Sequence, residues 1–223
     1  MQNDFVLRDK FTKKFELDIE TLFTNGYNDL CHEVVYSSYV AKCDRRVFYT
    51  LSRVESSVNL RKKMHHSYMI KKWVEILSKG KLFNFLAKEF IVADQNYNVT
   101  STIDIAGKVN DLKVIFMVRE VTEEVFKNEK ARRFDVVELM TQMWLSEVND
   151  GFLVYESLVE KSSCVFHIVP NVSVLNAVKE KLLYLRNCKL TGTLPEQKYE
   201  NSDADECQEC RFREECWRDK RDG

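Results

Sequence analysis

The sequence contains little glycine or proline and no long hydrophobic run. Its 223 residues include 6 Gly and 2 Pro, too few for a collagen-like or low-complexity chain. The longest purely apolar stretch is Val114–Val118, whereas a membrane-spanning helix needs about 20 apolar residues. The first residues, Met1–Val6, lack the basic and apolar segments of a secretory signal. We therefore expect a cytoplasmic protein in a reducing compartment, without a membrane partner.

Net charge is also almost absent, although charged residues are abundant. The 34 Lys+Arg and 35 Asp+Glu give a formal charge of -1. The apolar share of 44% and the aromatic share of 12% argue against a disordered chain. Charge is uneven locally, because Glu75 is the one acid among the cations between Arg61 and Lys81. Such a basic segment can neutralise phosphates, or it can form a solvated helix face.

Hydrophobic periodicity predicts a helical N-terminal region followed by a mixed region. We expect helices over 14–23, 37–53, 64–77, 81–90, 131–148 and 172–185, and strands over 98–105, 112–121, 152–158 and 164–169. The segment Ala106–Asp111 suits a hairpin turn. This order indicates an α/β (α+β) fold with a mixed central sheet flanked by helices. We divide the chain into a helical region over 1–90, a core over 91–200 and a cysteine-rich segment over 201–223.

Seven cysteines cannot all form disulfides within one chain. The tail carries a C-x2-C-x5-C pattern, and the best remote fourth donor is Cys43. Four thiolates suit an iron–sulfur cluster, whereas structural zinc sites usually draw on two C-x2-C-like pairs. From the spacing alone, iron, zinc and unligated thiols all remain open. The three other cysteines, Cys31, Cys164 and Cys188, are interpreted as packing residues.

The chain resembles the iron–sulfur branch of the RecB-like PD-(D/E)XK nucleases in two places. These are the tail Cys207–Cys216 and the string Cys43-Asp-Arg-Arg-Val-Phe-Tyr49. The CRISPR-associated exonucleases called Cas-four are most similar, and the AddB nuclease domain is a more distant match. The resemblance covers roughly residues 37–217. It implies a restriction-endonuclease-like fold with the nuclease core over 91–200. It also implies a [4Fe-4S] cluster that holds the tail against the N-terminal region, with the ligands Cys43, Cys207, Cys210 and Cys216.

The resemblance also implies a Mg²⁺ or Mn²⁺ site. Asp104 matches the first motif acid, Glu120 the second, and His66 or the neighbouring His65 the histidine from an upstream helix. An alternative register would use Asn110, Val118 and Glu120 as the three motif positions.

Two motif positions depart from the family pattern. Thr122 stands where the family has a lysine, and Lys113 or Arg119 could supply that charge instead. On an extended strand Arg119 is expected to face away from Glu120. The glutamine of the following helix is matched by Glu138 or Gln142.

The implied function is a metal-dependent deoxyribonuclease that acts on DNA ends or single strands. Its implied partners are DNA and the proteins of a DNA-processing or CRISPR adaptation complex, in antiviral defence. The basic segment would guide the DNA backbone through Arg61, Lys62, Lys63, Lys71 and Lys72. Two alternatives are a catalytically impaired nuclease-like scaffold that binds DNA or protein, and a zinc-stabilised nucleic-acid-binding protein of another fold.

Overall fold

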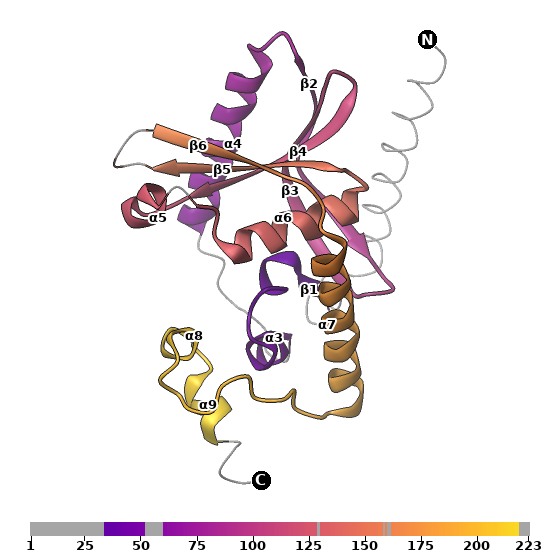
Figure 1. The fold of residues 1–223 in the computed structure, drawn as a ribbon, viewed down its shortest axis with the longest axis vertical. Helices are drawn as coiled ribbons and strands as arrows, with labels where there is room; N and C mark the ends of the chain where they lie inside the picture. Colours follow the sequence, from indigo (N-terminus) through magenta and orange to yellow (C-terminus); the bar gives the residue numbers. More distant parts are fainter. Residues whose placement is uncertain (1–33, 52–59, 129, 158, 160–161, 219–223) are drawn as a thin grey trace.

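A computed structural model describes residues 34–51, 60–128, 130–157, 159 and 162–218, with the backbone alone for 60–63. The described chain is a mixed α/β structure (Figure 1). Its strands are β1 Val35–Tyr36, β2 Phe83–Asp94, β3 Val99–Val109, β4 Leu112–Glu120, β5 Asp150–Ser157 and β6 Ser162–Ile168. Its helices are the 3-10 turn η1 Ser37–Tyr39, α3 Asp44–Leu51, α4 Leu60–Ser78, α5 Glu123–Lys127, α6 Arg133–Ser146, α7 Val172–Thr191, α8 Asp205–Gln208 and α9 Arg213–Arg218.

The strands form one six-stranded sheet of mixed direction. Its main order is β1-β3-β4-β5-β6, and β2 pairs with β3 outside this path. The β2–β3, β3–β4 and β5–β6 pairs are antiparallel, whereas β1–β3 and β4–β5 are parallel. The predicted mixed central sheet is confirmed.

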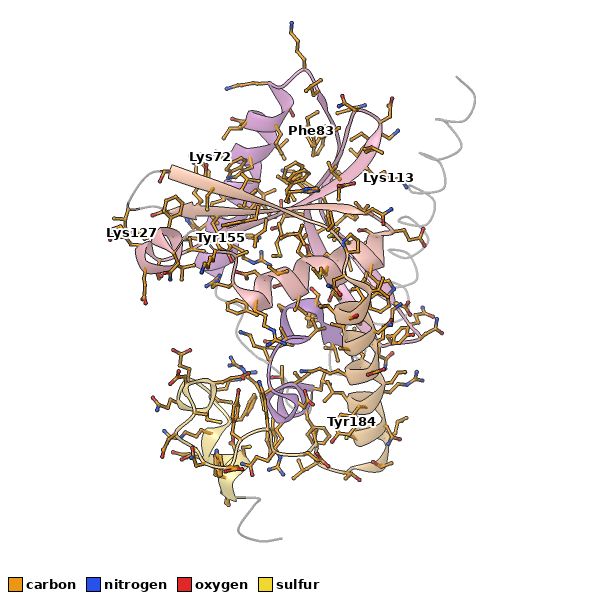
Figure 2. All side chains as sticks on the ribbon, in the orientation of Figure 1. Lys72, Phe83, Lys113, Lys127, Tyr155 and Tyr184 are labelled. Carbon is orange, nitrogen blue, oxygen red and sulfur yellow. The ribbon has the colours of Figure 1, made fainter. Side chains whose placement is uncertain are left out.

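Helices α4 and α6 cover opposite faces of the sheet (Figure 1). Ile70 of α4 belongs to one buried apolar cluster with β3, β4 and β5, and Leu139 of α6 belongs to another with the same strands. Phe83 lies on the α4 side and Tyr155 on the α6 side (Figure 2). Burial of two apolar faces explains why the central strands are nearly continuous apolar runs.

Strands β3 and β4 separate in the middle of β3. Their described pairing runs from Val109↔Leu112 to Ile105↔Phe116. On the same path through the sheet, β1 pairs with β3 at Val99 and Thr100. Asp104 therefore lies at the point where β4 leaves β3. A side chain there can reach both layers of helices.

The prediction of a helix over 81–90 is wrong, because this segment belongs to strand β2. The register of β2 against β3 shifts between Phe85 and Ala87, and Glu89 has a φ of 49°. These irregularities break the period-two alternation that identifies a strand. The N-terminal region is therefore not purely helical, since it supplies β1 and most of β2 to the sheet.

The hairpin turn is shorter than predicted. Strand β3 continues to Val109, and the turn is Asn110-Asp111, with φ angles of 48° and 67°. Two left-handed residues are what a two-residue hairpin loop of the primed type requires. Gly107 lies within β3, where an added Cβ would come 2.2 Å from Phe83 Cε2. This glycine therefore permits a close ring contact rather than the turn.

The remaining helices differ from prediction mainly in length. The expected helix over 37–53 is η1 followed by α3, while α7 extends beyond its predicted end. The helix expected over 14–23 lies outside the described residues. No helix within the described stretches of the chain is long and apolar enough to cross a membrane.

Candidate active site

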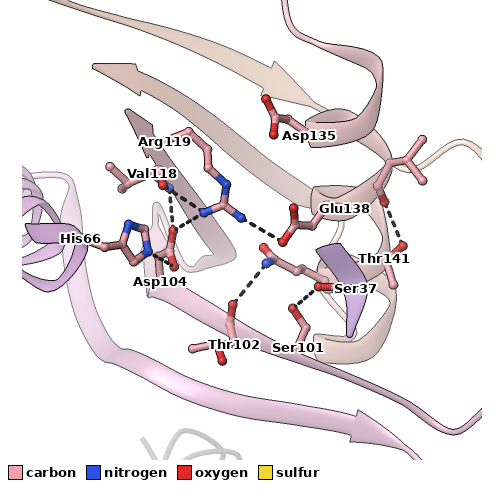
Figure 3. A network of polar contacts seen from close by, with 12 residues as sticks. Ser37, His66, Ser101, Thr102, Asp104, Val118, Arg119, Asp135, Glu138 and Thr141 are labelled. Carbon is pink, nitrogen blue, oxygen red and sulfur yellow. Dashed lines mark hydrogen bonds and ion pairs between the residues drawn. The ribbon is translucent and has the colours of Figure 1, made fainter. Parts of the chain in front are cut away.

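Asp104 is buried at the divergence of β3 and β4, with 4% of its surface exposed. Its Oδ2 accepts a hydrogen bond from the Val118 backbone N–H at 2.7 Å. Its Oδ1 lies 3.1 Å from His66 Nε2 on α4. Arg119 Nη1 is 3.4 Å from Oδ2 (Figure 3). The first predicted acid is thus held by groups from two strands and a helix.

Glu120, the second predicted acid, is the last residue of β4 and faces the same helix. Its Oε2 lies 3.1 Å from Nε2 of His65. This distance suits an ion pair, but the geometry is not that of a hydrogen bond, so the buried His65 Nε2 has no hydrogen-bond partner among the described residues. Consecutive histidines of α4 therefore face the two acids separately, His66 at Asp104 and His65 at Glu120.

Arg119 joins Asp104 to Glu138 of α6. Its Nη2 donates to Glu138 Oε1 at 2.9 Å, and its Nη1 donates to the Val118 carbonyl oxygen at 3.0 Å. Burial opposes the charge of Arg119, but the carboxylates of Glu138, Asp104 and Asp135 outweigh it and raise the arginine pKa. Burial raises the pKa of Glu138, and Arg119 opposes that change.

Glu120 and Arg119 do lie on different sides of the strand. Glu120 faces α4, and Arg119 contacts α6. Arg119 nevertheless reaches Asp104, because that carboxylate occupies the gap where the strands part. Alternation along one strand could not reveal this contact.

Gln142 and Thr122 are placed differently from each other. Gln142 is 1% exposed, its Nε2 donates to the Thr102 carbonyl oxygen at 3.2 Å, and its buried Oε1 has no hydrogen-bond partner in the described structure. Strand β4 ends at Glu120, so Thr122 is not on the strand but immediately precedes α5. Thr122 therefore does not share a strand face with Glu120.

The alternative register finds no support in this arrangement. Asn110 lies in the hairpin turn, and Val118 is fully buried. The histidines instead face Asp104 and Glu120.

Sequence reasoning missed Glu156, a buried acid at the same end of the sheet. Glu156 lies opposite Glu120 in the parallel β4–β5 register. Its Oε1 accepts from Lys72 Nζ, and its Oε2 accepts from Trp73 Nε1 at 3.1 Å. The available signal was its position near the carboxyl end of a strand parallel to the motif strand.

The predicted DNA-binding cations are only partly described. Lys71 is exposed, whereas the Lys72 ammonium pairs with Glu156 and its side chain is 47% exposed. The side chains of Arg61, Lys62 and Lys63, at the start of α4, are not among those described.

The side chains at this site are of the types that bind a hard divalent cation, but they are not arranged as a complete set of ligands. Carboxylate oxygens are the usual ligands of Mg²⁺ and Mn²⁺, and imidazole suits many divalent metals. Among the described residues, no group of three or more His, Cys, Asp or Glu is arranged to hold a metal ion. What the site presents is two His–carboxylate pairs, with His65 Nε2 left without a hydrogen bond. The residues thus fit such an ion chemically, without a preformed set of three ligands.

The four predicted cluster cysteines lie within range of mutual charge repulsion, although no three of the described cysteines are arranged to hold a metal ion. Burial raises the pKa of Cys207, and the neighbouring thiols of Cys43, Cys216 and Cys210 raise it further by charge repulsion. The Cys43 backbone N–H donates to Glu206 Oε1 at 2.8 Å. The tail therefore contacts the residue that directly precedes α3.

The three remaining cysteines include one clear packing residue. Cys188 is 4% exposed, and Cys164 packs partly buried against the core. Cys31 lies outside the described residues. None of the six described cysteines forms a disulfide.

The fold is similar to that of several solved exonucleases. An alkaline exonuclease from Laribacter hongkongensis matches with a TM-score of 0.54 and 10% identity, over 72% of this chain and 89% of that chain. A phage-related exonuclease from Haemophilus somnus 129PT matches with a TM-score of 0.51 and 13% identity, over 75% and 99%. The protein SSO0001 matches with a TM-score of 0.54 and 14% identity, over 81% and 83%. No family model and no curated protein matches the chain.

The six-stranded mixed sheet flanked by helices is consistent with a restriction-endonuclease-like nuclease fold. The alternative of a zinc-stabilised protein with another fold is wrong in its fold. At 10–14% identity, these similarities establish the fold alone.

Proposed function

We propose that this protein is a Mg²⁺- or Mn²⁺-dependent nuclease that acts on DNA ends or single strands. One observation carries the proposal: Asp104 and Glu120 each face a histidine of α4 where β3 and β4 part. The exonuclease-like fold supports it. So does the nucleotide in one neighbour, since the Laribacter hongkongensis enzyme has also been solved in complex with dAMP.

The chain's residues would divide the chemistry among them. His66, Asp104 and Glu120 are the proposed ligands. A bound divalent ion would supply an activated water and neutralise charge on the phosphate. The Val118 backbone N–H orients Asp104 through Oδ2. The His65 Nε2, which makes no hydrogen bond among the described residues, can hold a proton or accept one beside Glu120.

DNA is proposed to run along the exposed side of α4. Tyr68 is 66% exposed and Met64 is 74% exposed, and Lys71 is also exposed. Residues three and four apart are neighbours on a helix surface, so Tyr68 lies one turn from His65. An exposed aromatic ring beside cations suits the stacking of unpaired bases along a phosphate backbone. Because Lys72 is paired with Glu156, Lys71 is the better candidate for a phosphate contact.

A [4Fe-4S] cluster on Cys43, Cys207, Cys210 and Cys216 is proposed as a structural cofactor. Supporting it are the mutual charge repulsion of the four thiols and the hydrogen bond from the Cys43 N–H to Glu206 of the tail. The closer relation to CRISPR-associated Cas-four proteins, with a role in spacer acquisition and antiviral defence, stays a prediction from the sequence motifs.

The test is cleavage of end-labelled single-stranded and duplex DNA with Mg²⁺ or Mn²⁺. We expect Asp104→Asn and Glu120→Gln to lose at least about 100-fold in rate, because each removes a charged ligand. Asp111→Asn is the matched control, since it makes the same chemical change in the turn of the same hairpin, where asparagine tolerates the left-handed backbone. Equal cutting by the wild type and both site variants would show that a contaminant is responsible.

A catalytically impaired nuclease-like scaffold is the second candidate. It is favoured by Thr122 at the lysine position and by Arg119 on the Asp104 carboxylate. It predicts DNA binding without cleavage in either metal, and efficient metal-dependent cutting would exclude it.

A further inference from the structure

We infer that Arg119 is a positioning residue whose fixed positive charge partly balances the carboxylates of Asp104 and Glu138. This charge lowers the affinity of the acidic site for a divalent cation. This inference rests on the proposed function only in assuming a divalent-cation site at Asp104. Arg119, on the other side of the strand from Glu120, would then supply the positive charge that the motif lysine supplies in the family.

The side chain of Arg119 is held at both ends of its guanidinium. Nη2 donates to Glu138 Oε1 at 2.9 Å, while Nη1 is 3.0 Å from the Val118 carbonyl oxygen and 3.4 Å from Asp104 Oδ2 (Figure 3). These acceptors come from β3, β4 and α6. A planar guanidinium with several donors can bridge such divergent acceptors, which a lysine ammonium does less rigidly.

Charge balance explains why this arginine is needed. Asp104 and Glu138 have side chains that are 5% and 10% exposed, and buried carboxylates require a partner. The nearby Asp135 is paired separately, with Arg132 at 2.8 Å. Arg119 therefore faces two carboxylates with one positive charge, and His66 adds charge only when protonated. The site keeps a residual attraction for cations.

The arginine also restricts where an ion can bind. Asp104 Oδ2 is already occupied by the Val118 N–H and Arg119, whereas Oδ1 faces His66. A divalent ion would therefore approach Asp104 from the α4 side, where Glu120 also lies. The α6 side of the same carboxylate is held by Arg119.

The experiment is calorimetric titration of Mn²⁺ into the full-length protein, with no DNA present. Arg119→Gln removes a like charge a few ångströms from the ion, so we expect about tenfold tighter Mn²⁺ binding. Arg119→Lys keeps the charge and should stay within about twofold of the wild type. Arg133→Gln, an exposed arginine at the start of α6, is the matched control and should leave the affinity unchanged. Asp104→Asn should abolish the binding in every background, which locates the site.

Cleavage at saturating Mn²⁺ gives a second readout that moves in the opposite direction. Loss of the positioning contact should slow turnover by Arg119→Gln about 100-fold, although the metal binds more tightly. A purely structural role would weaken metal binding and turnover together. If circular dichroism shows that the Arg119→Gln variant does not fold, the Glu138→Gln variant is measured in its place. That variant leaves Arg119 to Asp104 alone and should weaken Mn²⁺ binding about tenfold.

The possible outcomes separate this inference from the proposed function. Tighter Mn²⁺ binding by Arg119→Gln without DNA cleavage by the wild type would support the inference and refute the nuclease activity. Cleavage by the wild type with unchanged or weaker Mn²⁺ binding in Arg119→Gln would overturn the inference and leave the nuclease standing. Absence of Mn²⁺ binding in both proteins would also overturn it.

Discussion

At the scale of single residues, buried carboxylates cluster at one end of the sheet. Four carboxylates are buried and each accepts from at least one basic side chain: Asp104, Asp135, Glu138 and Glu156. A buried charge is tolerated only when it is paired and hydrogen-bonded. Removing one partner of such an ion pair therefore lowers the free energy of unfolding by more than the pair contributes to it, because the other charge stays buried and unpaired.

Tyr155 provides a test of this principle at Asp135. The fully buried Tyr155 hydroxyl donates to Asp135 Oδ2 at 2.5 Å. Tyr155→Phe should lower the free energy of unfolding by about 1–3 kcal/mol, because a buried carboxylate loses a donor. Urea denaturation measures this, and Tyr68→Phe, at an exposed ring, is the control with little effect. Equal stability of the two variants would mean that Arg132 alone satisfies Asp135.

The Tyr155 hydroxyl also makes the free energy of unfolding depend on pH in the alkaline range. Burial and the hydrogen bond to Asp135 raise the pKa of Tyr155 to about 12, from an ordinary value of 10.0. The proton is held more tightly in the folded protein, so this contribution is complete below pH 10.0. It is lost as the pH rises towards about 12. Tyr155→Phe should remove this component of the alkaline destabilisation.

The predictable portion of the site is the portion that is local in sequence. Asp104 and Glu120 follow from the motif, and the two histidines follow from their place in the helix predicted over 64–77. Glu156 could not be found in this way, because Lys72 and Trp73 contact it across more than 80 residues of sequence. The contact between Arg119 and Asp104 depends on the parting of two strands, which no periodicity shows.

At the scale of elements, regular periodicity was predictive and irregular backbone was not. Strands β3 to β6 and helices α4, α6 and α7 lie close to their predicted ranges. The pattern of strand β2 suggests a helix, because its register shift and the positive φ of Glu89 disrupt the alternation. Gly107 suggests a turn because glycine is common there, yet the Phe83 ring is what requires it. Apart from this glycine, nothing in the local sequence indicates that the two strands approach each other closely.

Helix α4 has one side that faces Asp104 and Glu120 and one exposed side that carries Tyr68, and the proposed role of the exposed side can be tested separately. Tyr68→Ala should weaken the binding of single-stranded DNA by about 1–3 kcal/mol, the value of one base stacked on an aromatic ring. Fluorescence anisotropy with a labelled oligonucleotide, in the presence of EDTA, measures binding without cleavage. Tyr68→Phe keeps the ring and should bind as the wild type does. If both variants bind equally well, the bases do not contact this ring.

At the scale of the whole molecule, the formal charge of -1 is an average over different regions. The end of the sheet holds buried carboxylates, and α4 carries exposed lysines. The cysteine segment packs beside α3, away from α4 (Figure 1). One of its contacts is the hydrogen bond from the Cys43 N–H to Glu206. Burial raises the pKa of Glu206, but hydrogen bonds from Tyr199, Lys198 and the Cys43 N–H outweigh it and lower the pKa to about 2. The cluster proposed at the tail would therefore lie apart from the acidic site.

This separation leads to a prediction about metal loss. If the four thiols hold a [4Fe-4S] cluster, protein purified without oxygen should absorb at roughly 400 nm and contain about four irons per chain. Cys43→Ser should lose the iron and expose the tail to limited proteolysis, whereas Cys164→Ser, at a partly buried thiol in β6, should keep both. Because the Cys43 backbone N–H also donates to the Glu206 carboxylate, some docking should survive without the cluster. One zinc ion per chain in colourless protein would instead assign the site to zinc. Neither metal in anaerobic protein would leave the contacts of Glu206 and Arg45 to hold the tail.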